Sequence, residues 1–239
     1  MNSFQKNKKT KIRFSQHFLT DANVLKKISE SVDSLYKDKV LEVGPGRGSV
    51  TEIILSKKPK NLTLVEKDPS LILGLKEKYP SCNIINQDIL DYQVKEDVFV
   101  SSVPYSITRE ILLLICRSRS VRLSYLIIQK EVAQKISFEN PVPISVFVRT
   151  FFEVKKIFDI KKNSFTPPPQ ITSSFVVLKR IKEYEENVYA DYWNFLIKTM
   201  SRKNRSAEFL DEKFKGRRVS GLKGEELLKT YVDKDIHTH

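Results

Sequence analysis

The stretch that decides the fold reads Lys39-Val40-Leu41-Glu42-Val43-Gly44-Pro45-Gly46-Arg47-Gly48. Its first half is a short apolar run with the length of a buried strand, and its second half is a glycine turn. Glycines at such a turn tolerate positive φ and let the backbone approach a ligand closely. The stretch therefore predicts a strand over residues 39–43, then a ligand-binding turn, then a helix.

The glycine turn alone is a weak signal, because many turns are rich in glycine. Its spacing differs from the Gly-x-Gly-x-x-Gly of dinucleotide-binding proteins, and Glu42 lies just ahead of it. A carboxylate beside the turn suits a cationic ligand better than a pyrophosphate. S-adenosylmethionine, which carries a sulfonium and an ammonium group, meets this requirement.

Strands and helices alternate along the rest of the first two thirds of the chain. Strand-like segments lie at 61–65, 83–86, 98–101 and 123–128, and helix-like segments lie at 21–32, 49–57, from 68 onward and at 107–116. Two more strands, 151–160 and 173–180, flank a loop at 165–169 and are expected to add an antiparallel extension. The pattern predicts an α/β fold, a Rossmann-like sheet with helices on both faces.

The strand signals stop near residue 182, which suggests a second, smaller unit. We divide the chain into a basic flexible arm (1–13), a Rossmann-like methyltransferase domain (14–182) and a small helical, basic, RNA-binding domain (183–239). An amphipathic helix is expected over 189–200, followed by a basic cluster and two shorter helices.

The charge of the chain favours an anionic partner. The 42 basic residues exceed the 29 acidic ones by 13, an excess that costs self-repulsion unless such a partner offsets it. Nucleic acid is the first candidate and an anionic membrane surface the second. No apolar run approaches the roughly 20 residues that span a bilayer, and no apolar stretch follows the basic N-terminus as in a signal peptide.

The two cysteines and three histidines favour neither a disulfide framework nor a zinc cluster. We therefore expect a cytoplasmic protein that needs no metal and associates with no membrane.

Two carboxylates lie at strand ends, where S-adenosylmethionine would need hydrogen-bond acceptors. Glu66 ends the second strand, about 20 residues beyond the glycines, where it can accept hydrogen bonds from both ribose hydroxyls. Asp88 follows the third strand and can accept from the adenine amine. For one carboxylate alone, a helix cap or a solvated strand end would be the better interpretation. Because ligands bind at the carboxyl ends of such sheets, successive acidic residues there favour a cofactor site.

The fourth strand leads into Ser102-Val103-Pro104-Tyr105. Enzymes that methylate an exocyclic amine of a base often carry Asn or Asp, two small or apolar residues and an aromatic residue at this place. The polar side chain and a backbone carbonyl accept the amine hydrogens, and the aromatic ring stacks on the base. The alternative is a tight turn with a buried tyrosine; the position beside the predicted cofactor favours the active-site interpretation.

Three further segments have the sequence pattern of a known enzyme family. They are Arg13-Phe14-Ser15-Gln16-His17-Phe18-Leu19, Gln129-Lys130-Glu131-Val132-Ala133 and Phe165-Thr166-Pro167-Pro168-Pro169. With them the chain resembles the rRNA adenine N6,N6-dimethyltransferases, which include the KsgA-type small-subunit enzymes, their archaeal and eukaryotic relatives and the erythromycin-resistance methylases. The resemblance covers residues 11 to about 180, and the stretch at 200–205 resembles archaeal and eukaryotic members.

The resemblance, together with the glycine turn, implies S-adenosylmethionine contacts at His17, Leu19, Glu42, Gly44, Gly46, Glu66, Asp88 and Ser102. It implies catalytic roles for Ser102, Pro104 and Tyr105. Substrate contacts are expected at Tyr105, Phe165, Arg202, Lys203 and Arg205. The chain departs from the family pattern at Ser15, which replaces Gly, and at His17 and Ser102, which each replace Asn.

The implied function is N6-dimethylation of adenines in 16S rRNA, performed by a monomer on a precursor of the small ribosomal subunit during ribosome biogenesis. One alternative is a catalytically weak or inactive relative that acts as a ribosome-assembly factor, since Ser102 replaces Asn. Another is an adenine N6-methylase of 23S rRNA or of DNA. The retention of Glu42, Gly44, Glu66, Asp88 and Tyr105 favours an enzyme.

Overall fold

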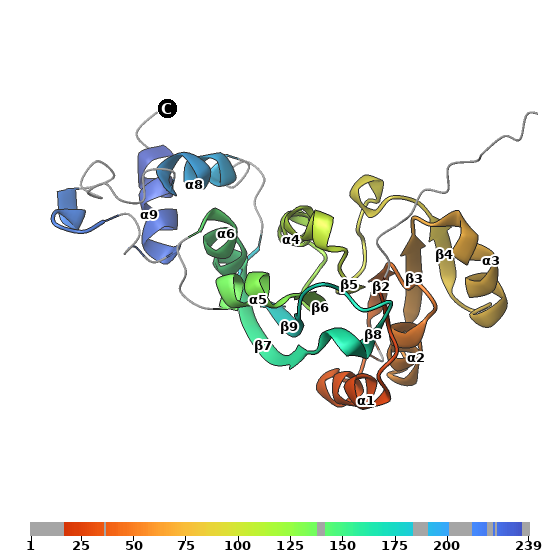
Figure 1. The fold of residues 1–239 in the computed structure, drawn as a ribbon. Helices are drawn as coiled ribbons and strands as arrows, with labels where there is room; N and C mark the ends of the chain where they lie inside the picture. The colour runs from red at the N-terminus through yellow and green to blue at the C-terminus, as the bar shows by residue number, and fades with distance from the viewer. Residues whose placement is uncertain are drawn as a thin grey trace, which may run out of the picture.

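The computed structural model describes residues 17–35, 37–137, 142–183, 191–200, 212–218, 222 and 224–235. Within these residues a seven-stranded sheet, ordered β4-β3-β2-β5-β6-β9-β7, forms the centre (Figure 1). The parallel strands are β2 (Lys39–Val43), β3 (Asn61–Glu66), β4 (Asn83–Asn86), β5 (Val98–Ser102) and β6 (Leu123–Gln129). The antiparallel extension consists of β9 (Ser173–Arg180) and β7 (Phe152–Ile160). This confirms the predicted α/β class.

Helices cover both faces of the sheet. They are α1 (Ala22–Ser31), α2 (Ser49–Ser56), α3 (Pro69–Lys78), α4 (Thr108–Arg117), α5 (Lys130–Ser137) and α6 (Pro143–Phe151). Two more of the described helices, α8 (Tyr192–Met200) and α9 (Gly224–Asp235), pack against α6 and not directly against the sheet (Figure 1). Figure 1 shows α1 and α2 on one side of the sheet and α4 and α6 on the other. None of the helices in the described part of the chain has both the length and the apolarity that crossing a membrane requires.

Alternating strand residues divide the core into two clusters, because successive side chains of a strand point to opposite faces. Val40 and Val98 pack with the α1–α3 side, whereas Leu41 and Phe99 pack with the α4 and α6 side. All four are fully buried. The parallel strands are therefore covered on both faces, as their nearly continuous apolar sequence predicts.

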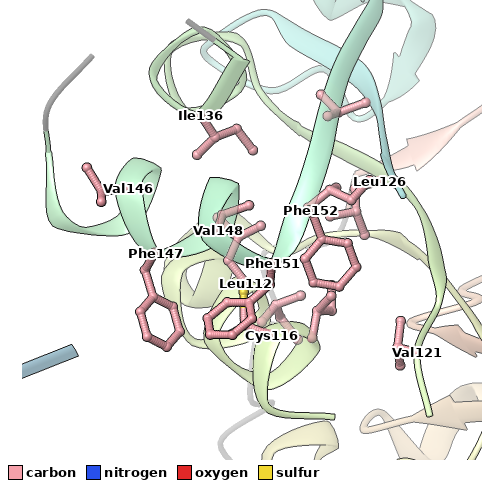
Figure 2. Close-up of a cluster of buried hydrophobic side chains, with 14 of the residues drawn as sticks. Leu112, Cys116, Val121, Leu126, Ile136, Val146, Phe147, Val148, Phe151 and Phe152 are labelled. Carbon is pink, nitrogen blue, oxygen red and sulfur yellow. The ribbon is translucent and has the colours of Figure 1, made fainter. Parts of the chain in front are cut away.

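The C-terminal helices α8 and α9 add side chains to the core cluster on the α4 and α6 side of the sheet. The ring of Tyr192 in α8 lies 5.9 Å from that of Phe147 in α6 and 5.3 Å from that of Tyr231 in α9. Figure 2 shows Phe147 and Phe151 near Leu112 and Cys116 of α4. The domain boundary at residue 183 stays a prediction, because residues 184–190 lie outside the described part.

Two helices and one strand pair differ from the sequence prediction. No element was predicted for the Val- and Phe-rich segment ahead of the strand at 151–160, and this segment forms helix α6 with Pro143 in its first turn. Burial of Phe147 and Phe151 stabilises that helix despite its β propensity. Helix α5 was not predicted either. The short strands β1 (Phe18–Leu19) and β8 (Phe165–Thr166) pair with each other, although 165–169 was expected to be a loop.

The start of α2 is packed too closely for a side chain. Gly48 has φ +87°, and a Cβ added there would lie 2.2 Å from the Tyr79 hydroxyl oxygen. That hydroxyl donates a hydrogen bond of 2.9 Å to the Gly48 carbonyl oxygen. The contact ties the first helix after the glycine turn to the C-terminal end of α3.

We predict that Gly48→Ala lowers the free energy of unfolding by about 2–4 kcal/mol, because it combines an unfavourable φ with a clash against a buried ring. Urea titration of the purified protein measures this change. The matched control is Gly74→Ala within α3, where no atom lies within 4 Å of the added Cβ; it should raise stability by up to about 1 kcal/mol. Equal effects of the two substitutions would contradict the packing described here.

Candidate active site

A cleft of about 510 Å³ lies at the carboxyl ends of the parallel strands. The strand order reverses between β2 and β5, since the chain runs from β2 outward to β4 and then returns to β5. Open α/β sheets bind ligands at such a reversal, and the volume falls within the roughly 300–1,000 Å³ of small-molecule sites. Topology and size thus both mark this cleft as a ligand site.

The glycine turn forms one wall of the cleft. Gly44 and Gly46 have φ of +66° and +59°, and nothing lies within 4 Å of a Cβ added to Gly44. A Cβ on Gly46 would lie 2.9 Å from the ring of Phe18, and the Arg47 guanidinium carbon lies 4.7 Å from the centre of that ring. The turn therefore presents open backbone to the cleft at Gly44, and β1 packs over it at Gly46.

Glu66 is bound to the glycine turn by backbone hydrogen bonds. Its two carboxylate oxygens accept from the N–H groups of Gly46 at 3.3 Å and of Asp68 at 2.9 Å. Burial raises the pKa of this carboxyl above its ordinary value. Each oxygen keeps a further acceptor position, so the side chain can still receive hydroxyl hydrogens from a ligand.

Glu42 is buried beneath the same turn. One of its oxygens accepts a hydrogen bond of 2.6 Å from the Thr51 hydroxyl. Burial, with a smaller effect from the charge of Glu66, raises the pKa of the Glu42 carboxyl to about 8, although the Thr51 hydrogen bond opposes the rise. A cation in the cleft would favour the ionised form.

Asp88 is both a helix cap and a residue of the cleft. It caps the short 3₁₀ helix η1 (Ile89–Asp91), accepting from the Leu90 N–H at 3.1 Å, and it also lines the cleft. The Lys67 ammonium lies 2.6 Å from its other oxygen, and that hydrogen bond lowers the pKa of Asp88.

The predicted catalytic motif opens into the same cleft. Ser102 ends β5, and the Val103 N–H donates to the Ile127 carbonyl oxygen at 2.9 Å. Tyr105 begins the 3₁₀ helix η2 (Tyr105–Ile107), with its ring centroid 6.2 Å from that of His17 at an interplanar angle of 30°. The motif and the acidic residues Glu42, Glu66 and Asp88 therefore line a single cavity.

The family model for ribosomal RNA adenine dimethylases matches residues 7–234 of this sequence. The chain belongs to the ribosomal RNA adenine dimethylase family. This confirms the family and the methyltransferase class predicted from the motifs.

Individual relatives agree with this membership. The chain is 35% identical over 204 residues to ribosomal RNA small subunit methyltransferase A of Malacoplasma penetrans, covering 81% of this chain and 75% of the relative. The corresponding protein of Mycoplasmopsis synoviae is 34% identical over 232 residues, covering 92% and 88%. A dimethyladenosine transferase from Plasmodium falciparum has the same fold, with a TM-score of 0.79 at 21% identity over 92% of this chain and 98% of that one.

The cleft of this dimethylase-family chain brings together the predicted residues that the structure describes. They are His17, Leu19, Glu42, Gly44, Gly46, Glu66, Asp88, Ser102, Pro104, Tyr105 and Phe165. Their roles toward ligands stay predictions. Arg202, Lys203 and Arg205 lie outside the described residues, so their expected RNA contacts also stay predictions.

Sequence reasoning missed other residues that line the cleft, notably Arg47, Lys67, Gln87 and Ser173. Gln87 and Lys67 adjoin predicted residues, so proximity in sequence was a usable signal for them. Ser173 begins the strand that follows the 165–169 segment of the family match, so the resemblance offered a signal for it that the site prediction did not use.

Glu42 should make the stability of the ligand-free protein depend on pH. Its pKa is about 8 when folded and has an ordinary value of 4.5. The unfolded chain therefore binds fewer protons than the folded one between these values, and stability falls as pH rises from about 4.5 to 8.

We predict that Glu42→Gln raises the free energy of unfolding at pH 7.5 by on the order of 1–3 kcal/mol and has little effect near pH 4.5. Urea titrations from pH 4.5 to 8.5 measure the difference. The control is Glu52→Gln on α2, where the hydrogen bond from Lys78 lowers the pKa of an exposed carboxyl; its effect should have the opposite sign. A Glu42→Gln protein less stable than the parent at pH 8 would contradict the burial argument.

Proposed function

We propose that this chain uses S-adenosylmethionine to dimethylate the N6 amine of adenines in 16S rRNA during ribosome biogenesis. The observation that carries the proposal is the opening of Ser102 and Tyr105 into the cavity that Glu42, Glu66 and Asp88 also line. Family membership supports adenine as the target base. The small-subunit substrate follows from the relatives, which are named for it.

The chemistry of the cleft fits S-adenosylmethionine. Glu66 would accept from the ribose hydroxyls, Asp88 would accept from the adenine amine, and Glu42 would balance the positive charge of the methionine part. The open backbone at Gly44 permits close approach of the ligand. His17, Leu19 and Gly46 complete the proposed contacts. Once bound there, the cofactor supplies an electrophilic methyl group.

The motif would prepare the adenine amine for attack. Its lone pair is delocalised into the ring, so the site must favour a pyramidal nitrogen. Ser102 Oγ would accept one amine hydrogen and a backbone carbonyl the other. The Pro104 carbonyl oxygen already accepts from the Ile107 N–H at 3.1 Å and from the Thr108 hydroxyl at 3.4 Å. Because these bonds occupy both of its acceptor positions, we favour the Val103 carbonyl for this role. Tyr105 and Phe165 would hold the base by stacking, and the small Ser102 leaves room for a monomethylated amine.

The RNA must present its adenine outside a helix. Extruding a base costs a few kcal/mol, and least from a loop or helix end. The net charge of +13 supports binding of the phosphate backbone. We assign that binding to the N-terminal arm and to the basic stretch at 202–223. The monomeric state, the cytoplasmic location and the independence from metal remain part of the proposal.

We predict that the protein transfers labelled methyl groups from S-adenosylmethionine to adenines of small ribosomal subunits that lack them. Tyr105→Ala should lower kcat by about 100-fold, because an unstacked base is poorly aligned. Its cofactor dissociation constant, measured by calorimetry, should stay within about twofold of the parent value, since the tyrosine is assigned to the base.

Unmethylated large ribosomal subunits serve as the control and should receive no label. Label in their rRNA instead would support the 23S alternative. Cofactor binding without transfer to either subunit would support the assembly-factor alternative.

A further inference from the structure

The ring of Tyr105 needs a fixed orientation if a base is to stack on it productively. The residue follows Pro104 and begins η2, which fixes its backbone. Its side chain can still rotate about two bonds and lies half-buried at the cleft. Something beyond the motif must therefore hold the ring.

Ser173 supplies that contact. Its Oγ lies 2.7 Å from the Tyr105 hydroxyl oxygen, from a position 68 residues further along the chain. The serine is fully buried and lines the cleft. It is the first residue of β9, paired with Gln129 of β6 on one side and Ile160 of β7 on the other. Neighbouring strands on both sides make its backbone a rigid support.

The other end of β9 is hydrogen-bonded to the end of α4, the helix that follows Tyr105 in the chain. Arg180, the last residue of β9, donates hydrogen bonds to the carbonyl oxygens of Ile115 at 3.0 Å and Ser118 at 2.8 Å, at the C-terminal end of α4. Tyr105 lies just ahead of the N-terminal end of that helix. One strand therefore fixes both ends of the segment from Tyr105 to Ser118.

We propose that Ser173 is a positioning residue for methyl transfer, which holds the phenol of Tyr105 so that the ring faces the target adenine. The inference rests on the proposed function. Without this hydrogen bond the ring can turn toward His17, whose ring already lies 6.2 Å away. Such a turn would misplace the base relative to the methyl group, and small misplacements are costly in rate.

The test compares Ser173→Ala with Ser174→Ala. Ser174 is equally buried and neighbours Ser173 on β9, but its hydroxyl donates to Asp159 at 2.7 Å. We expect Ser173→Ala to lower kcat for methylation of small-subunit rRNA by about 5- to 15-fold, the effect of one lost hydrogen bond, with the KM for S-adenosylmethionine unchanged. Ser174→Ala should keep the parent kcat.

A double-mutant cycle separates positioning from a general structural role. Tyr105→Phe keeps the ring but cuts the same hydrogen bond, so it should lower kcat as much as Ser173→Ala does. The double variant should be no slower than either single variant. Multiplied effects, or a Ser173→Ala protein with the parent kcat, would overturn the proposal.

Two controls keep the outcomes distinct. If Ser173→Ala does not fold, Tyr105→Phe alone decides, and a parent-like kcat would reject the role of Ser173. If the parent protein methylates no rRNA, the proposed function and this inference both fail. An active parent with an unaffected Ser173→Ala variant rejects the inference alone.

Discussion

The backbone of the glycine turn after β2 is the constraint on which the rest of the cleft depends. Gly44, Gly46 and Gly48 all have positive φ, and each has a different role in the cleft. Gly44 leaves open backbone, Gly46 donates its N–H to Glu66 and receives the ring of Phe18, and Gly48 packs on Tyr79. The turn thereby sets the position of a carboxylate from β3 and of the strand that covers it.

A further part of the cleft comes from distant segments of the chain that are hydrogen-bonded to one another. β1 pairs with β8, and the His17 Nδ1 donates to the Pro167 carbonyl oxygen at 2.8 Å. Beyond the pair, the Ser164 hydroxyl donates to Asp21 at 2.9 Å. The cover over the proposed cofactor position and the loop that carries Phe165 therefore form one hydrogen-bonded unit. A displacement of β1 would therefore also displace the loop that carries Phe165, and the reverse.

The sequence predicted the parts of this arrangement that have local signatures. The parallel strands are short apolar runs between turn signals, and the predicted cleft residues lie at the ends of these strands or in motifs that the family resemblance identifies. Helix α6 was not predicted because its Val- and Phe-rich sequence suits a strand, and packing against α4 decides its conformation. The β1–β8 pair and the Ser173–Tyr105 hydrogen bond were not predictable, since each depends on the relative placement of segments 68 or more residues apart.

The central claim is that one cleft holds both the methyl donor and the base to be methylated. A crystal structure of the protein with sinefungin, a stable analogue of the donor, tests it directly. The ribose should bind Glu66, the adenine should lie beside Asp88, and the amine that takes the place of the transferable methyl group should point toward Ser102 and Tyr105. An analogue bound elsewhere, or a cleft filled by the protein's own side chains at saturating sinefungin, would contradict the claim.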